Sequence, residues 1–355
     1  MIQKINHDQL RRCLVLLWLS DIPACIVGDV GTGKTTAVED LVRELDTKME
    51  NKFNLWKVFL GLIDATDIGG IPMKNQDGKI DYAPPRCLPF GTDESGIIFG
   101  DEYDRAAPDV QNAFNQILLG REIHNNVISD NAYVILAMNG EADSYTTPLS
   151  KAARNRVCTL FLSPIAGDSH SQWDEWARKN NVNSYVRGFA RYRSDLIKDD
   201  VEYSELAMIT PRSRDMAGRI LDKVNEVDFK TDDILLPCLA GVIGTAAAQE
   251  LLAFMEQESN LPDIKQLLDN PDKFEDMADD LYDRPDINFM LGISISNYVT
   301  NNKNYGEKAI KFFTEKFQPE NRTWAVDNIV SSNPNIITTP EYKKFFNKQK
   351  TLMLD

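Results

Sequence analysis

The stretch Ile22–Thr36, IPACIVGDVGTGKTT, decides the fold of this 355-residue chain. Its residues 24–27 are a short apolar run that predicts a buried strand, and residues 28–35 match G-x-x-x-x-G-K-[ST] at every fixed position. Apolar side chains then recur at helical spacing over residues 37–45, which predicts a helix. A strand, a glycine-rich loop and a helix in this order predict a phosphate-binding loop in an α/β fold with a parallel sheet.

The residue types of this loop suit a bound nucleotide. Glycines let consecutive backbone N–H groups point at phosphate oxygens, and the N-terminus of the following helix adds a partial positive charge. We expect Lys34 to reach the β- and γ-phosphates and the hydroxyl of Thr35 to ligate Mg²⁺. The predicted nucleotide-binding residues are Gly28, Asp29, Val30, Gly31, Thr32, Gly33, Lys34, Thr35 and Thr36.

A second chemical landmark is the run IIFGDE at residues 97–102, an apolar strand that ends in two acids. We expect Asp101 to hold Mg²⁺, mostly through water, and Glu102 to orient and deprotonate the attacking water. The alternative is that both are solvated acids at a strand end. Gly100 stands where a bulky apolar residue is usual, and this departure predicts room for a neighbouring side chain.

Three polar residues further along the chain are candidates for the same site. A strand is predicted over residues 133–137, and Asn139 after it is expected either to contact the γ-phosphate and the water or to cap the strand. Arg154 and Arg156 follow. Each is either a solvated cation at a helix end or a side chain that acts on the γ-phosphate of a neighbouring subunit.

The remaining elements of this half are predicted from pattern. Helices are expected over residues 7–19 and 110–119, and a strand over residues 55–60. Asp77-Gly78 within residues 73–85 is a hairpin signal. Sequence alone does not decide whether that hairpin contacts a partner or is a surface decoration.

Composition limits the class of protein. A hydrophobic content of 43% is ordinary for a globular chain and allows a large core in two or three structural units. The net charge of −15 argues against a broad nucleic-acid surface, although a local basic pore stays open. The longest apolar run, residues 13–19, is far too short to span a membrane, and the first residues do not resemble a signal peptide. Five widely spaced cysteines predict core thiols in a reducing cytoplasm.

The order of these landmarks resembles the AAA+ ATPases and, within them, the MoxR-like branch, which carries an insert in helix 2. The resemblance covers roughly residues 8 to 225. It rests on GDVGTGKT, on DIGGIP with the hairpin, on FGDEYDRAAPDVQNAFNQIL, on LAMNG, and on LSKAARNRV followed by ITPRSR. The segment after the acidic pair, residues 105–113, is the most specific of these.

The resemblance implies roles for individual residues. It implies that Asn139 is sensor 1, that Arg156 is the arginine finger and that Arg212, in the Thr-Pro-Arg triplet, is sensor 2. Arg156 is followed by valine where the family usually has phenylalanine, so Arg154 remains a competitor for the finger. Whether Arg212 acts on its own nucleotide or on that of a neighbour stays open.

The predicted domains are an AAA+ nucleotide-binding core over residues 1–166, a helical lid over 167–258 and a helical C-terminal extension over 259–355. By resemblance the chain is expected to hydrolyse ATP with Mg²⁺ as a ring, taken to be a hexamer whose pore the hairpin faces. Its expected target is a client or adaptor protein, such as one with a von Willebrand factor A domain. The alternatives are a nucleic-acid-processing motor like the McrB GTPases and a nucleotide-sensing scaffold with little turnover. Neither a membrane nor nucleic acid is an expected partner.

Overall fold

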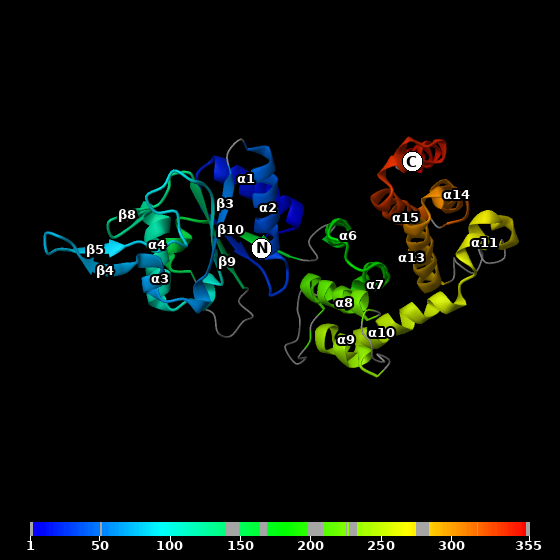
Figure 1. Cartoon of the computed structure of the whole chain (residues 1–355), viewed down its shortest axis with the longest axis horizontal. Helices are drawn as coiled ribbons and strands as arrows, with labels where there is room; N and C mark the ends of the chain where they lie inside the picture. Colours follow the sequence, from blue (N-terminus) through cyan, green and yellow to red (C-terminus); the bar gives the residue numbers. More distant parts are fainter. Residues whose placement is uncertain are drawn as a thin grey trace. The chain divides into compact units, whose positions relative to one another are not determined.

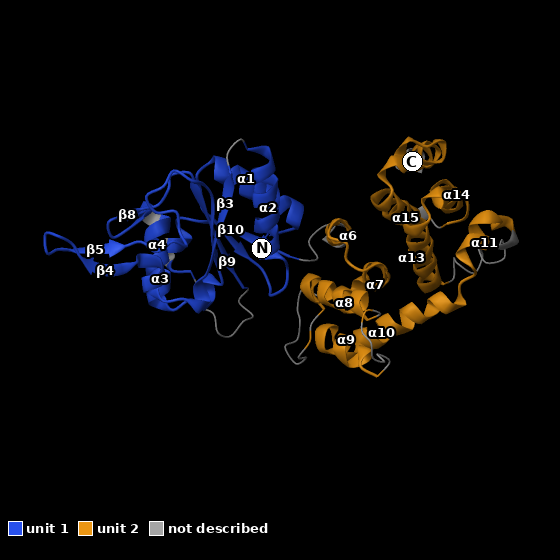
Figure 2. Ribbon diagram, in the orientation of Figure 1, with its two compact units in different colours: residues 1–169 blue, residues 170–355 orange. Residues whose placement is uncertain are grey.

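The computed structural model describes residues 3–49, 52–139, 149–163, 169–196, 207, 209–224, 226, 233–274, 284–317 and 319–352. The chain divides into two compact units, residues 1–169 and 170–355, which Figure 2 colours separately. The first unit is α/β, and the described part of the second is helical. The further division of the second unit at residue 258 stays a prediction.

The first unit is built on a six-stranded sheet in which every paired strand runs parallel, in the order β1-β10-β2-β9-β6-β3. Its strands are β1 (Lys4–Ile5), β2 (Ala24–Val27), β3 (Phe53–Phe59), β6 (Ser95–Asp101), β9 (Ala132–Met138) and β10 (Cys158–Leu162). Its helices are α1 (His7–Leu19), α2 (Lys34–Lys48), α3 (Ala65–Gly69), α4 (Pro108–Gly120) and α5 (Lys151–Arg154). Because the strands are parallel, the loops after β2, β6 and β9 leave the sheet at the same edge.

Alternate residues of the central strands face two different cores. Ile97 and Phe99 on β6 pack in the core that contains α1 and α2, whereas Ile98 packs in the core that contains α4. This period of two explains why the strands are apolar on both faces. Figure 1 shows α1 and α2 on one side of the sheet and α4 on the other.

The space predicted at Gly100 is confirmed. A methyl group there would lie 2.8 Å from Leu60, and 3.0 Å from both Leu136 and Phe114. These three side chains fill the volume that a bulky residue would occupy, so α4 packs close to the strand that carries the acidic pair.

Two small hairpins extend the first unit, and Figure 1 shows the first of them projecting past α4. They are β4 (Ile71–Lys74) with β5 (Ile80–Ala83), and β7 (Glu122–Ile123) with β8 (Asn126–Val127). The turn of the second hairpin holds the first: the His124 ring stacks on Tyr82 with centroids 3.7 Å apart, and Asn126 donates to the Tyr82 carbonyl. The first hairpin was predicted from Asp77-Gly78 and is confirmed.

The described part of the second unit consists of helices around one core. They are α6 (Ser169–Lys179), α7 (Ser184–Tyr192), α8 (Pro211–Lys223), α9 (Leu235–Ile243), α10 (Thr245–Glu256), α11 (Ile264–Asp269), α13 (Pro285–Asn301), α14 (Gly306–Lys316), α15 (Pro319–Ser332) and α16 (Pro340–Leu352). The predicted α/β core with a helical remainder is therefore confirmed. None of the described helices is long and apolar enough to cross a lipid bilayer.

The structure corrects two smaller expectations. The strand β10, between β1 and β2, was not predicted from the sequence, although its apolar run is typical of a strand. The prediction of core thiols is right for Cys25, which is fully buried, and wrong for Cys87 and Cys238, which are exposed.

Candidate functional site

The glycine-rich loop leaves β2 and is shaped by backbone conformations that favour glycine. Gly31 has φ 77° and Gly33 has φ 91°, both in the left-handed region. At Gly28 a methyl group would lie 2.8 Å from the carbonyl oxygen of Leu162 on β10, so the loop starts tightly against the neighbouring strand. Gly33 is also the residue before α2, and the loop thus delivers Lys34 and Thr35 to the first turn of that helix.

The Lys34 side chain folds back over the loop. Its Nζ donates to the carbonyl oxygens of Gly28 at 2.5 Å and Asp29 at 3.0 Å, and to Oδ1 of Asn139 at 3.0 Å. All three acceptors are uncharged oxygens. An ammonium group held in this way can exchange them for the charged oxygens of a phosphate, and charge-assisted hydrogen bonds are the stronger ones. Asn139, predicted as a γ-phosphate contact, is therefore beside Lys34.

The residues predicted to hold Mg²⁺ are brought together. The Thr35 hydroxyl donates to Oδ2 of Asp101 at 2.7 Å, although the two residues lie on different elements, α2 and β6. A hydroxyl and a carboxylate are hard oxygen ligands of the kind that Mg²⁺ takes beside substrate phosphates. This donor pair fits the predicted metal.

Glu102 directly follows the Mg²⁺ candidate and has left-handed backbone angles, φ 55° and ψ 39°. For a non-glycine residue this conformation is uncommon and is found at functional sites. The Oε1 atom of Glu102 lies 3.9 Å from Nη1 of Arg105, and the Glu102 side chain is 35% exposed. Water can therefore reach this carboxylate.

The loop's other predicted residues lie around Lys34. The Thr32 hydroxyl donates to the carbonyl of Asp29 at 2.8 Å and helps to close the loop. Val30 is 42% exposed, and Thr36 is partly buried in the first turn of α2. All nine predicted nucleotide-binding residues thus belong to one continuous turn from β2 into α2.

The sequence analysis missed Asp104, a fully buried carboxylate in the short 3-10 helix η2 (Tyr103–Arg105). Its Oδ2 accepts a hydrogen bond of 2.9 Å from the backbone N–H of Asn139, and its Oδ1 has no hydrogen-bond partner within the described part of the chain. Burial raises the pKa of Asp104, while the Asn139 N–H and the charge of Lys34 oppose the rise. Asp104 therefore fixes the end of β9, where Asn139 meets Lys34.

His7, at the start of α1, also went unpredicted. Its Nε2 lies 2.8 Å from the carbonyl oxygen of Thr32, and a methyl group at Gly33 would lie 3.1 Å from the same nitrogen. A carbonyl only accepts, so Nε2 carries the proton. Burial lowers the pKa of His7, with the Thr32 hydrogen bond acting in the opposite direction. The neutral ring thus packs on the outside of the loop and supports it.

The predicted arginines are exposed. Arg154 is the last residue of α5, and its Nε donates to the carbonyl of Leu149 at 2.9 Å. Arg156 follows two residues later, also exposed. Arg212 is an exposed residue in the first turn of α8, in the second unit. The predicted roles of these three arginines in catalysis remain predictions.

Comparison with solved structures gives distant likenesses. A Cytophaga hutchinsonii protein assigned as an ATPase is 14% identical, with 70% of this chain and 90% of that chain covered and a TM-score of 0.36. NtrX from Brucella abortus is 12% identical, with 71% of this chain and 69% of the NtrX chain covered and a TM-score of 0.36. A RuvB variant of Thermotoga maritima is 14% identical, with 75% of this chain and 76% of the RuvB chain covered and a TM-score of 0.42.

Comparison with curated proteins gives no match. Comparison with protein families does: residues 23–157 match the family described as AAA domain (dynein-related subfamily). The matched region runs from the residue before β2 to the residue after Arg156, and so contains the glycine-rich loop, the acidic pair and Asn139. Residues 23–157 of this chain are therefore an AAA domain of the dynein-related subfamily.

Proposed function

We propose that the chain is a cytoplasmic, Mg²⁺-dependent ATPase of MoxR type that works as a ring, a hexamer by resemblance, to remodel a partner protein. The observation that carries the proposal is the meeting of Lys34, Thr35, Asp101 and Asn139 at one edge of the parallel sheet. Four residues from three separate segments supply the donors and acceptors that bind a triphosphate and position its terminal group. An AAA domain implies ATP binding and hydrolysis in general; the rest is proposed.

In this proposal the glycine-rich loop binds the phosphates of ATP, and Lys34 orients the terminal phosphate. Thr35 and Asp101 would hold Mg²⁺, which when bound neutralises charge on the phosphate oxygens. Asn139 keeps the Lys34 amine in place before ATP arrives, and both then face the γ-phosphate. Glu102 accepts the proton of the attacking water, because its carboxylate is accessible to water and adjoins Asp101.

Hydrolysis needs one more cation. Negative charge spreads over the γ-phosphoryl oxygens as the bond breaks. Arginine fingers stabilise this charge and increase kcat by about 10³–10⁵-fold. Arg154 and Arg156 are the candidates, and both are exposed at the end of α5. Arg154 is bonded to the Leu149 carbonyl through Nε. The resemblance assigns the finger to Arg156, and we propose this residue as the one that serves a neighbouring subunit.

The partner surface proposed here is the β4–β5 hairpin. Its apolar side chains face solvent: Ile71 is 65% exposed, Met73 58% and Ile80 59%. The strand register places Ile71 and Met73 on one face of the hairpin and Ile80 on the other, so both faces offer apolar side chains to a protein partner. A client polypeptide, or an adaptor with a von Willebrand factor A domain, is the partner class that the resemblance suggests.

Glu102→Gln tests the proposed base. The amide keeps the size of the side chain but cannot take a proton, so we expect ATP binding close to that of the wild type and hydrolysis reduced at least about 10²-fold. Binding is measured by calorimetry and turnover by phosphate release. Hydrolysis within a few-fold of the wild type would show that another group deprotonates the water.

Mixing two inactive variants tests the shared site. Arg156→Ala and Glu102→Gln should each lack hydrolysis but bind ATP. A mixed ring places an intact Glu102 opposite an intact Arg156 at some interfaces, so the mixture should recover part of the activity. Arg154→Ala combined with Glu102→Gln is the matched comparison. If mixed rings form and remain inactive, or if dilute protomers hydrolyse ATP at the full rate, Arg156 does not act across the interface.

Asp104→Asn and Asp104→Ala test the positioning of Asn139. The asparagine variant keeps an oxygen that accepts from the Asn139 N–H, so it should retain most of the turnover. The alanine variant should lose turnover by up to about 10²-fold with little change in KM, since misplaced groups slow the chemical step. Asp130→Ala, at a side chain that is 95% exposed, is the control. Equal losses in both Asp104 variants would refute a role through this hydrogen bond.

A further inference from the structure

The helix α8 presents two arginines on opposite sides. Arg212 is exposed, whereas Arg214 is 5% exposed. Residues two apart on a helix are about 200° apart around its axis, so the environment of Arg214 is separate from that of Arg212. Arg212 has a predicted role at the nucleotide, and Arg214 has none.

Arg214 is a buried cation whose donors are not all used. Its Nη1 has no hydrogen-bond partner within the described part of the chain, and no carboxylate there forms an ion pair with it. Its guanidinium lies 5.1 Å from the ring centre of Trp173, whose buried indole N–H also has no hydrogen-bond partner among the described residues. Burial lowers the pKa of Arg214 to about 10, so the side chain is still charged at neutral pH. Such a group is costly unless an acceptor completes it.

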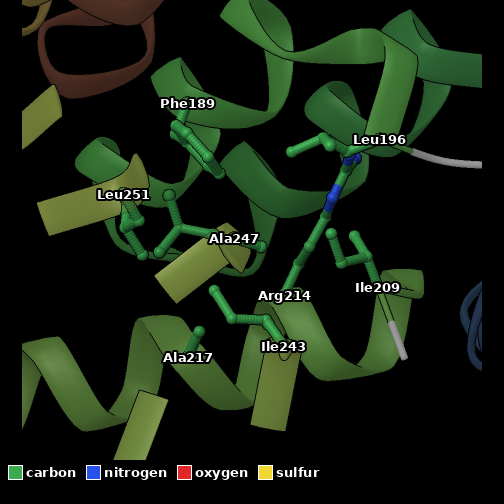
Figure 3. Close-up of a pocket in the computed structure, with 9 residues that line it drawn as sticks. Phe189, Leu196, Ile209, Arg214, Ala217, Ile243, Ala247 and Leu251 are labelled. Atoms are coloured by element: carbon green, nitrogen blue, oxygen red, sulfur yellow. The ribbon is translucent and has the colours of Figure 1, made fainter. Parts of the chain in front are cut away.

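The Arg214 side chain lines two cavities in the second unit. Its stem lines a small pocket whose other residues are apolar, and Figure 3 shows the stem crossing this pocket with the nitrogen atoms toward Leu196. Arg214 also lines a larger cavity of about 310 Å³, together with Trp173, Arg187, Arg191 and Ser194. This volume is room for several water molecules or for one small ligand group.

The larger cavity has an excess of positive charge. Three arginines line it, from α7 and α8, and Asp174 is the one carboxylate among its described lining residues. Asp174 is already bonded to Nε of Arg187 at 3.0 Å. Arg191 and Arg214 thus face the cavity without a carboxylate of their own among those lining residues.

We infer that this cavity binds a phosphate group, taken from inorganic phosphate or a small phosphorylated molecule, and that Arg214 is its main ligand. A phosphate offers several charged acceptor oxygens to the guanidinium of Arg214, to Arg191 and to the Trp173 N–H. The site is separate from the nucleotide loop of the first unit and goes beyond the proposed ATPase. Bound phosphate gives an acceptor to the buried donors of Trp173 on α6 and Arg214 on α8, and so stabilises the packing of these two helices.

The test is a calorimetric titration of inorganic phosphate into the full chain. Because the nucleotide loop also takes phosphate, the chain carries Lys34→Ala throughout. We expect saturable binding that weakens at least about 10-fold when Arg214→Met is added, since methionine keeps the apolar stem and removes the charge. Arg219→Met is the matched control: this arginine is on the same helix, with 67% of its side chain exposed, and binding should not change.

A second variant and a salt control complete the test. Arg191→Gln should also weaken phosphate binding, and it covers the case in which Arg214→Met does not fold. Sodium chloride, at the same ionic strength as the phosphate solution, should not compete with phosphate for the cavity. Three results would overturn the assignment: absence of saturable phosphate binding, phosphate binding by both Arg191→Gln and Arg214→Met that is unchanged from the Lys34→Ala parent, or tighter binding of acetate than of phosphate.

Discussion

The contact between the Lys34 amine and Asn139 is the interaction on which the site depends. It joins the first turn of α2 to the end of β9, and the Thr35–Asp101 hydrogen bond joins the same turn to β6. A parallel sheet makes this possible, because the carboxyl ends of neighbouring strands open at one edge. The site is therefore assembled by the fold itself, and preorganisation of this kind is a main source of electrostatic catalysis.

The sequence predicted the parts of the site that have a dense local signal. The loop from Gly28 to Thr35 has a fixed spacing, because its glycines must adopt conformations that other residues avoid. Asp101 and Asn139 were predicted because each directly follows an apolar strand, and the carboxyl edge of such a strand is where polar residues do chemistry. The α/β class followed from the same pattern.

The features that escaped prediction depend on contacts between distant segments. Asp104 looks like an ordinary acid after a strand, and its burial beneath Asn139 appears when η2 and β9 are adjacent. His7 meets the loop across 25 residues of sequence. The burial of Arg214 was not predicted either: helical spacing places this arginine on the side of α8 that carries the buried Ala217 and Leu221, whereas Arg212 is exposed. The strands β1, β7 and β8 were not predicted either. Each is two residues long, which is too short for a periodic signal.

The most direct test of the central claim is a calorimetric titration of ATP into the wild-type chain and into Lys34→Ala. The account predicts that the wild type binds ATP and that the variant loses most of its affinity, because no other residue of the loop carries a positive charge. Lys48→Ala, on the same helix but with 65% of its side chain exposed, should bind as the wild type does. Near-normal ATP binding by Lys34→Ala would contradict the account.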